Sequence, residues 1–173
     1  MKLSELENKI LLFRGMELSL KIKKTPFSNS RISLKDNCLT VSLSGLVKNE
    51  ESQCEEAVKK IYAWYKAQAR RFFLQEAELE RTKQGVFFND IAIKDTVTRW
   101  GSCSAQKNLN FNWRLVMAPP HILKYVVCHE IAHLTQLNHS TEFWSLVETY
   151  YPDYKEAKQW LRDNGQKLLS FTI

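Results

Sequence analysis

The sequence predicts an α+β fold in a single domain, and three observations support this prediction. Residues 17–44 alternate between polar and apolar side chains, as β-strands with one buried face do. Apolar residues recur at helical spacing over 53–81, and the chain from residue 86 onward contains strand-like runs followed by helical segments. Because 173 residues suit one domain, we expect one unit over 1–173, with a strand-rich lead-in at 1–52, a long helix at 53–81 and a metal-binding core at 86–173.

The lead-in should form a small antiparallel sheet. Its alternation is clearest over 18–23 and 39–43, and the residues between these runs include Pro26 and Asn29, which are typical of turns. The following helix should be amphipathic, because its apolar side chains fall on one stripe from Cys54 to Phe73.

The third segment should begin with short strands. Runs over 86–88 and 91–93 are rich in apolar and β-branched residues, and Leu109, Phe111 and Trp113 alternate with asparagines. We expect two or three strands here, which would form a second part of the sheet structure.

Three helices should follow these strands. Pro120 suits the first turn of a helix, which we expect to run to about Leu137. A second helix should cover about 140–151, and a last helix over about 153–162 should end before Gly165.

Composition indicates an ordinary cytoplasmic protein. No stretch approaches 18 consecutive apolar residues, and charged residues interrupt the amino-terminal segment, so we expect neither a membrane-spanning helix nor a secretory signal. The four cysteines lack C-x-x-C spacing, and we interpret them as reduced thiols. The oligomeric state is not predicted.

The net charge of +6 is unevenly distributed, because the basic excess lies mostly before residue 86. On the long helix, Lys59, Lys66 and Arg70 fall within a narrow arc that could face a phosphate-bearing partner such as a nucleotide or nucleic acid. A solvated charged surface is the alternative interpretation of these residues.

The strongest functional signal is His129-Glu130-Ile131-Ala132-His133. A step of four residues places both imidazoles on one face of a helix, about one turn apart, where they can bind one metal ion. Glu130 lies on the adjacent face, where it can reach a water molecule instead of the metal. We therefore predict His129 and His133 as zinc ligands and Glu130 as the catalytic base.

A catalytic zinc site needs three protein ligands and one open position. His139 is the leading third ligand because it follows His129 by ten residues, the separation in the longer motif H-E-x-x-H-x-x-G-x-x-H. That motif has glycine where this chain has Gln136. We therefore expect the chain to reverse at Asn138 in a left-handed conformation, which asparagine tolerates better than most residues.

Other side chains could also bind a metal ion at this site. Glu142 and Glu148 on the following helix are alternative third ligands, and thiolates from Cys103 or Cys128 would make the site structural instead of catalytic. Burial explains both cysteines, although the glycine and small residues beside Cys103 suit a tight loop near a site. His121 has no partner at ligand spacing, and no role is assigned to it.

The last 80 residues resemble the YgjP-like metallopeptidase domain, a zincin family close to the SprT and WLM groups. The resemblance is carried by five blocks in order: Thr98–Ser104, Asn110–Leu115, Ala118–Pro120, Tyr125–Leu134 and Asn138–Trp144. It implies an α+β zincin fold, zinc bound by His129, His133 and His139, and Glu130 as the base. Residues 1–52 resemble the family only in general character.

Three functions follow from these residues. The first is a zinc metallopeptidase that acts on a peptide or protein, which could pair with the edge of the strand containing Asn110 and Asn112. The second is a nucleotide phosphohydrolase, and the third is a metal-stabilised nucleic-acid-binding module, which would have no need of Glu130. Arg99 could stabilise an oxyanion or form a structural ion pair, and it stays outside the predicted site.

Overall fold

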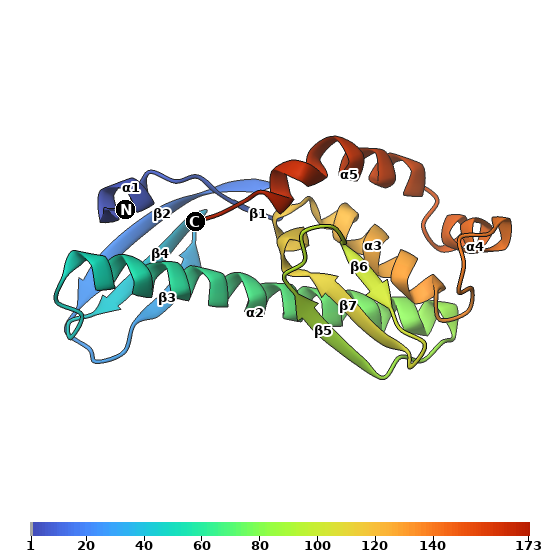
Figure 1. Cartoon of the computed structure of the whole chain (residues 1–173), viewed down its shortest axis with the longest axis horizontal. Helices are drawn as coiled ribbons and strands as arrows, with labels where there is room; N and C mark the ends of the chain where they lie inside the picture. Colours follow the sequence, from blue (N-terminus) through green and yellow to red (C-terminus); the bar gives the residue numbers. More distant parts are fainter. Residues whose placement is uncertain (1) are drawn as a thin grey trace. The chain divides into compact units, whose positions relative to one another are not determined.

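The computed structural model describes residues 2–173, which form two compact units. The first unit comprises the chain up to Ala67 together with Thr172 and Ile173, and the second comprises Gln68–Phe171. The helix α2 (Glu50–Gln84) contributes residues to both units, and the two are described separately below (Figure 1). That the chain acts as one catalytic domain stays a prediction.

The first unit contains a short helix and a four-stranded mixed sheet. Its elements are α1 (Leu3–Glu7), β1 (Leu11–Phe13), β2 (Met16–Thr25), β3 (Arg31–Lys35) and β4 (Cys38–Ser44), with the strand order β1-β2-β4-β3. The predicted antiparallel sheet is therefore only partly correct, because β2 and β4 pair in parallel. The more polar strand β3 takes the edge, and β4, whose Leu39, Val41 and Leu43 are fully buried, takes the centre.

The amino-terminal half of α2 covers the apolar side of this sheet. Ile61 and Tyr65 are fully buried, the Tyr65 hydroxyl donates a hydrogen bond of 2.8 Å to the Leu12 carbonyl, and Trp64 packs on Phe13 at 4.9 Å between ring centroids. The helix begins three residues earlier than predicted because Asn49 accepts a hydrogen bond from the Ser52 backbone and so caps the first turn.

The second unit is built on a three-stranded sheet of β5 (Asp90–Lys94), β6 (Gly101–Cys103) and β7 (Asn108–Asn112). The strand order is β5-β7-β6, with β5 parallel and β6 antiparallel to the central β7. Residues 86–88 form no strand, contrary to expectation. The alternation predicted for β7 is confirmed over 108–111, because Leu109 and Phe111 are fully buried, whereas Asn108 and Asn110 are only partly buried. It fails at Asn112, which is 1% exposed.

Four helical segments complete this unit: the 3-10 helix η1 (Trp113–Met117), α3 (Pro120–Ala132), α4 (Thr141–Tyr150) and α5 (Tyr154–Leu169). The start of α3 and the extent of α4 agree with the sequence prediction. Helix α3 contacts β6, α4 and α5, so it lies at the centre of this unit (Figure 1).

Two predicted helix ends are wrong. Helix α3 ends at Ala132 instead of Leu137, because the amides of Leu134 and Thr135 bond three residues back and tighten the last turn. Helix α5 continues through Gly165, where a Cβ atom would lie 3.0 Å from the Trp100 ring. Because Gly165 has no side chain, the Trp100 indole packs against the helix at this position, and the glycine does not end the helix.

No helix within residues 2–173 has both the length and the apolar character needed to cross a membrane.

We predict that Phe73→Ala lowers the free energy of unfolding by about 3–5 kcal/mol in urea titrations, since it leaves a cavity in the core. Phe73 on α2 is fully buried and stacks on Phe111 of β7, with ring centroids 4.3 Å apart and planes 6° apart. The neighbouring Leu74→Ala is the control, because Leu74 is 44% exposed and should change stability by less than about 1 kcal/mol. Equal effects of the two substitutions would contradict this description of the core.

Candidate metal centre

The structure brings His129, His133 and His139 together. His129 lies in the last turn of α3, and His133 is the residue that caps its carboxyl end. The chain then returns His139 to the same place before Ser140, whose hydroxyl accepts a hydrogen bond from the Phe143 amide and caps α4. One ligand atom from each histidine lies within 4.8 Å of those of the other two.

The imidazole rings converge closely. Ring centroids are 5.0 Å apart for His129 and His133, 5.0 Å for His129 and His139, and 4.7 Å for His133 and His139. The Nε2 atoms of His129 and His139 are 3.1 Å apart. Zinc bonds imidazole nitrogens at about 2.0–2.1 Å, which places two ligand nitrogens about 3.4 Å apart around a tetrahedral ion, so the Nε2 atoms of His129 and His139 are spaced to share one ion.

The protonation state of the histidines also fits a metal ion. Burial, with a smaller contribution from His133 and His139, lowers the pKa of His129 to about 3, and burial lowers the pKa of His133. The Nδ1 atom of His133 lies 2.9 Å from the Gln136 carbonyl, so it carries the proton and leaves Nε2 free to bind a metal. The buried Nδ1 atom of His129 has no hydrogen-bond partner among the described residues. Neutral imidazoles are the form that binds metal.

Aromatic side chains from α4 surround the histidines. Phe143 is fully buried and stacks on His133 at 4.5 Å between centroids, and Trp144 stacks on His139 at 5.8 Å. The ammonium of Lys158 on α5 lies 4.3 Å from the centroid of the Trp144 ring, which places a positive charge beside the histidine group.

Glu130 lies on α3 next to His129 but faces β6. It is 6% exposed, and burial raises the pKa of its carboxyl to about 8 in the metal-free chain. A nearby divalent cation would favour the ionised form and lower this pKa. A carboxyl whose pKa lies near neutral is suited to accepting and donating protons.

Gly101 of β6 provides the space that Glu130 occupies. A Cβ atom at position 101 would lie 2.6 Å from Oε1 of Glu130 and 2.7 Å from its Cγ, so any side chain there would displace the carboxylate. The sequence indicated a tight loop at this glycine, whereas the structure makes it the first residue of a strand.

The other candidates lie outside the histidine group within residues 2–173. Cys128 faces α2, where Gln84 lies 3.7 Å from its Sγ, and Cys103 lies near Glu130, with burial the main cause of its raised pKa. Glu142 is exposed and Glu148 pairs with Lys155 at 3.6 Å. His121 is likewise exposed. The structure thus favours histidine over these alternatives, while the ligand set itself stays a prediction.

Arg70 of the predicted anion-facing ridge donates a hydrogen bond of 3.0 Å to the Ile91 carbonyl, so it supports β5, and the ridge itself stays a prediction. One further expectation is corrected. The edge of β7 cannot accept a peptide, because β7 is the central strand and pairs on both sides. Within the described chain, no strand pairs with the second edge of β6, the strand that carries Gly101.

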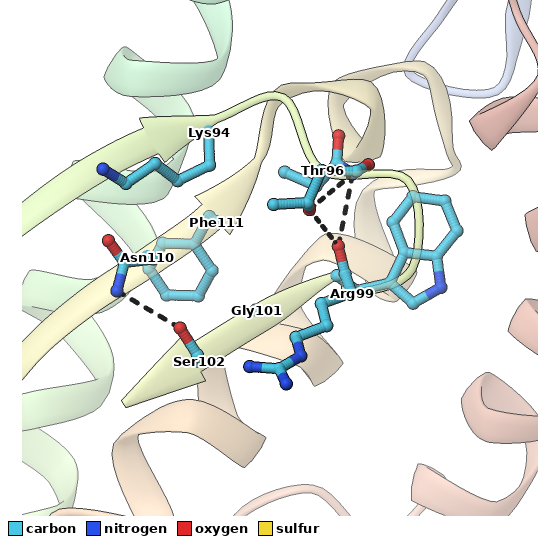
Figure 2. A pocket seen from close by; sticks show the side chains of 9 residues that line it. Lys94, Thr96, Arg99, Gly101, Ser102, Asn110 and Phe111 are labelled. Carbon is cyan, nitrogen blue, oxygen red and sulfur yellow. Dashed lines mark hydrogen bonds between the residues drawn. The ribbon is translucent and has the colours of Figure 1, made fainter. Parts of the chain in front are cut away.

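A pocket of about 390 Å³ lies beside β6 (Figure 2). Lys94 and Arg99 contribute positive charge, no acidic residue lines it, and Asn110 donates a hydrogen bond of 3.2 Å to the Ser102 hydroxyl. Buried Asn112 fixes the loop before β6, because its amide donates to the Thr96 and Arg99 carbonyls at 2.7 and 3.2 Å. Arg99 is therefore held at the pocket through its backbone.

Sequence reasoning missed three features of this site: Gly101 against Glu130, Trp144 against His139, and Lys158 beside Trp144. Of the residues in these contacts, only the adjacent pair Trp100-Gly101 suggested a nearby site from the sequence, and the sequence there predicted a loop. The other contacts depend on how α4 and α5 return to α3, which residue spacing does not reveal.

The α+β fold and the group of three histidines fit a zincin-like metallopeptidase domain. The chain belongs to the YgjP-like metallopeptidase domain family, whose sequence model matches residues 2–164. Membership implies a hydrolase with a metal ion, typically zinc. No curated protein matches the sequence significantly.

We predict that His139→Ala weakens zinc binding at least about hundredfold, measured by competition with a chromogenic chelator. Loss of a group that only orients a ligand already costs about 10–100-fold, and loss of a ligand should cost more. His121→Ala is the control, because His121 is exposed and should leave the affinity unchanged. Full affinity in His139→Ala would eliminate the three-histidine site.

We predict that Gly101→Ala lowers turnover about hundredfold while zinc content and the cooperative unfolding transition stay unchanged. The added Cβ must displace the Glu130 carboxylate, and a shift of about 1 Å in a catalytic group can cost this factor. Ser170→Ala, an exposed substitution after α5 and outside the site, is the control. Wild-type turnover in Gly101→Ala would show that Glu130 does not act from its position against β6.

Proposed function

We propose that this protein is a zinc-dependent metallopeptidase with His129, His133 and His139 as ligands and Glu130 as the general base. One observation carries the proposal: three imidazoles converge within 4.8 Å, burial lowers the pKa of His129 and His133, and the next residue after His129 is a buried glutamate with a raised pKa. This arrangement combines a metal site with three protein ligands and a proton acceptor on the same helix.

The residues have distinct roles in this proposal. The three histidines hold the ion, and the Gln136 carbonyl orients His133. A zinc ion held there lowers the pKa of water and polarises a carbonyl oxygen. Glu130 accepts the proton of the attacking water and returns it to the leaving nitrogen, while Gly101 keeps its carboxylate in place.

The free edge of β6 supports an extended peptide as substrate. A peptide that adds to this edge as a strand would pass beside Glu130, because Gly101 of β6 contacts the glutamate side chain. Backbone hydrogen bonds would supply affinity with little dependence on sequence. The pocket beside β6, with Lys94 of β5 and Arg99 of the preceding loop, favours acidic side chains in the substrate.

A second candidate function is hydrolysis of a nucleotide, and one specific observation favours it. A pocket of about 340 Å³ next to the histidine group contains Trp144, Tyr154, Lys158 and Arg162. The two aromatic rings stack at 5.3 Å and could hold a base, and the cations could hold phosphate oxygens. The same water-activating residues would then attack a phosphoryl centre.

The substitution Glu130→Gln distinguishes the two hydrolytic functions, on peptides or on nucleotides, from a metal-binding protein that catalyses no reaction. The variant should retain wild-type zinc content and lose about 10²–10⁴-fold in turnover, since the amide cannot accept the proton. Unfolded proteins, peptides and nucleoside triphosphates form the substrate panel. Cleavage of peptides alone supports the metallopeptidase, and release of phosphate or pyrophosphate alone supports the second candidate.

Two outcomes would contradict the proposal. Activity that persists in Glu130→Gln at equal zinc content would remove the glutamate from the mechanism. A wild-type protein that is fully loaded with zinc and cleaves nothing in the panel would favour a structural metal.

A further inference from the structure

The sheet of the first unit has one solvent-facing side that is strongly basic. Side chains alternate along its strands, so the side opposite buried Leu20, Leu39 and Val41 carries their neighbours in sequence. The strand register arranges these neighbours in three rows across β2, β4 and β3. The rows are Ser19-Cys38-Lys35, Lys21-Thr40-Ser33 and Lys23-Ser42-Arg31.

These nine residues, which we call the basic face, consist of four cations and five small polar or thiol side chains. Lys21, Lys23, Arg31 and Lys35 are all exposed. The three rows contain no acidic residue. Glu17 precedes Ser19 on β2, Asp36 lies in the turn after Lys35, and the Glu7 carboxylate accepts a hydrogen bond of 2.6 Å from the Ile22 amide of β2.

None of the four cations forms an ion pair with any residue in 2–173. Other cations of the chain do pair, for example Arg114 with Asp95. Arg31 makes one aromatic contact, 5.3 Å from the centroid of the Phe27 ring, and Phe27 is 60% exposed.

The spacing of the cations suits a phosphodiester chain. Two residues along a strand span about 6.6 Å, and strands lie about 4.8 Å apart, so the four charges cover a patch of roughly 13 by 10 Å. Lysine, arginine and serine or threonine hydroxyls are the groups that contact phosphate oxygens in nucleic-acid complexes. The short side chains between the cations let a backbone approach the sheet closely.

We propose that the basic face binds the phosphate backbone of a single-stranded nucleic acid, with Phe27 stacking on a base at its margin. A flat sheet face presents no helix that could enter a duplex groove, whereas sheets and exposed aromatic rings suit unpaired strands. The face also carries no apolar side chain that would insert into a lipid surface. The inference concerns the first unit and does not depend on the proposed hydrolase activity.

The test measures binding of the full chain to a fluorescent single-stranded 20-mer by anisotropy across a salt series. Four phosphate contacts predict a slope of log affinity against log salt of about −3. Replacement of Lys21, Lys23, Arg31 and Lys35 by glutamine should remove most of this slope and weaken binding by roughly hundredfold at 0.1 M salt. Phe27→Ala should weaken binding about fivefold or more while leaving the slope unchanged.

A matched control removes four cations of the same unit that lie outside both the basic face and the ridge of α2. Lys2, Lys24 and Lys48 are exposed and Lys9 is partly exposed, and their replacement by glutamine lowers the net charge equally. This control should bind within about threefold of the wild type. If the quadruple variant of the basic face fails to fold, the pair Lys21→Gln and Lys23→Gln is compared with Lys24→Gln and Lys48→Gln.

Four results would overturn the proposal: no binding by the wild type, equal losses in the two quadruple variants, tighter binding to the corresponding duplex, or binding only to vesicles of anionic phospholipid. Equal losses would show that net charge alone drives association. Zinc removal should leave binding unchanged, so failure here is distinguishable from failure of the hydrolase proposal.

Discussion

The candidate site depends on one constraint: His129 and His133 must stay neutral while they crowd together with His139 beyond the end of α3. Their ring centroids lie 4.7–5.0 Å apart, a separation at which three positive charges would repel strongly. Burial solves this problem by lowering the pKa of His129 to about 3. The chain reversal after Ala132 brings the three rings together. It places the Gln136 carbonyl beside His133 and the ring of His139 beside that of His129.

Glu130, the proposed base, is positioned by a second set of contacts. Glu130 occupies space that Gly101 leaves open, and the preceding residue, Trp100, packs against Gly165 inside α5. Asn112 holds the loop before β6 through the carbonyls of Thr96 and Arg99, and its own backbone amide bonds Trp100. Helix α3, the edge strand β6 and helix α5 thus pack together through Gly101, Gly165 and the indole of Trp100.

The sequence predicted the α+β class, the long helix, the start of α3, the extent of α4 and the residues that the structure clusters. These features depend on local patterns: helical spacing, proline in a first turn and a four-residue step between histidines. The sequence did not predict the parallel pairing of β2 and β4, the early end of α3 or the continuation of α5 through Gly165. Those outcomes depend on contacts between distant segments, such as the packing of Trp100 against α5, which no local pattern encodes.

The backbone conformation of Asn138 also differs from the prediction. Among residues 2–173, the non-glycine residues with positive φ are Arg14, Asp36, Asn37 and Lys107, and Asn138 is not one of them. The predicted left-handed turn at Asn138 is therefore wrong, and the tightened end of α3 reverses the chain instead.

The central claim is a site with three histidine ligands and one open position, and X-ray absorption at the zinc K edge of the reconstituted protein tests it most directly. The account predicts three imidazole nitrogens at about 2.0–2.1 Å and one further light atom. A sulfur ligand at about 2.3 Å, or fewer than three imidazoles, would contradict it.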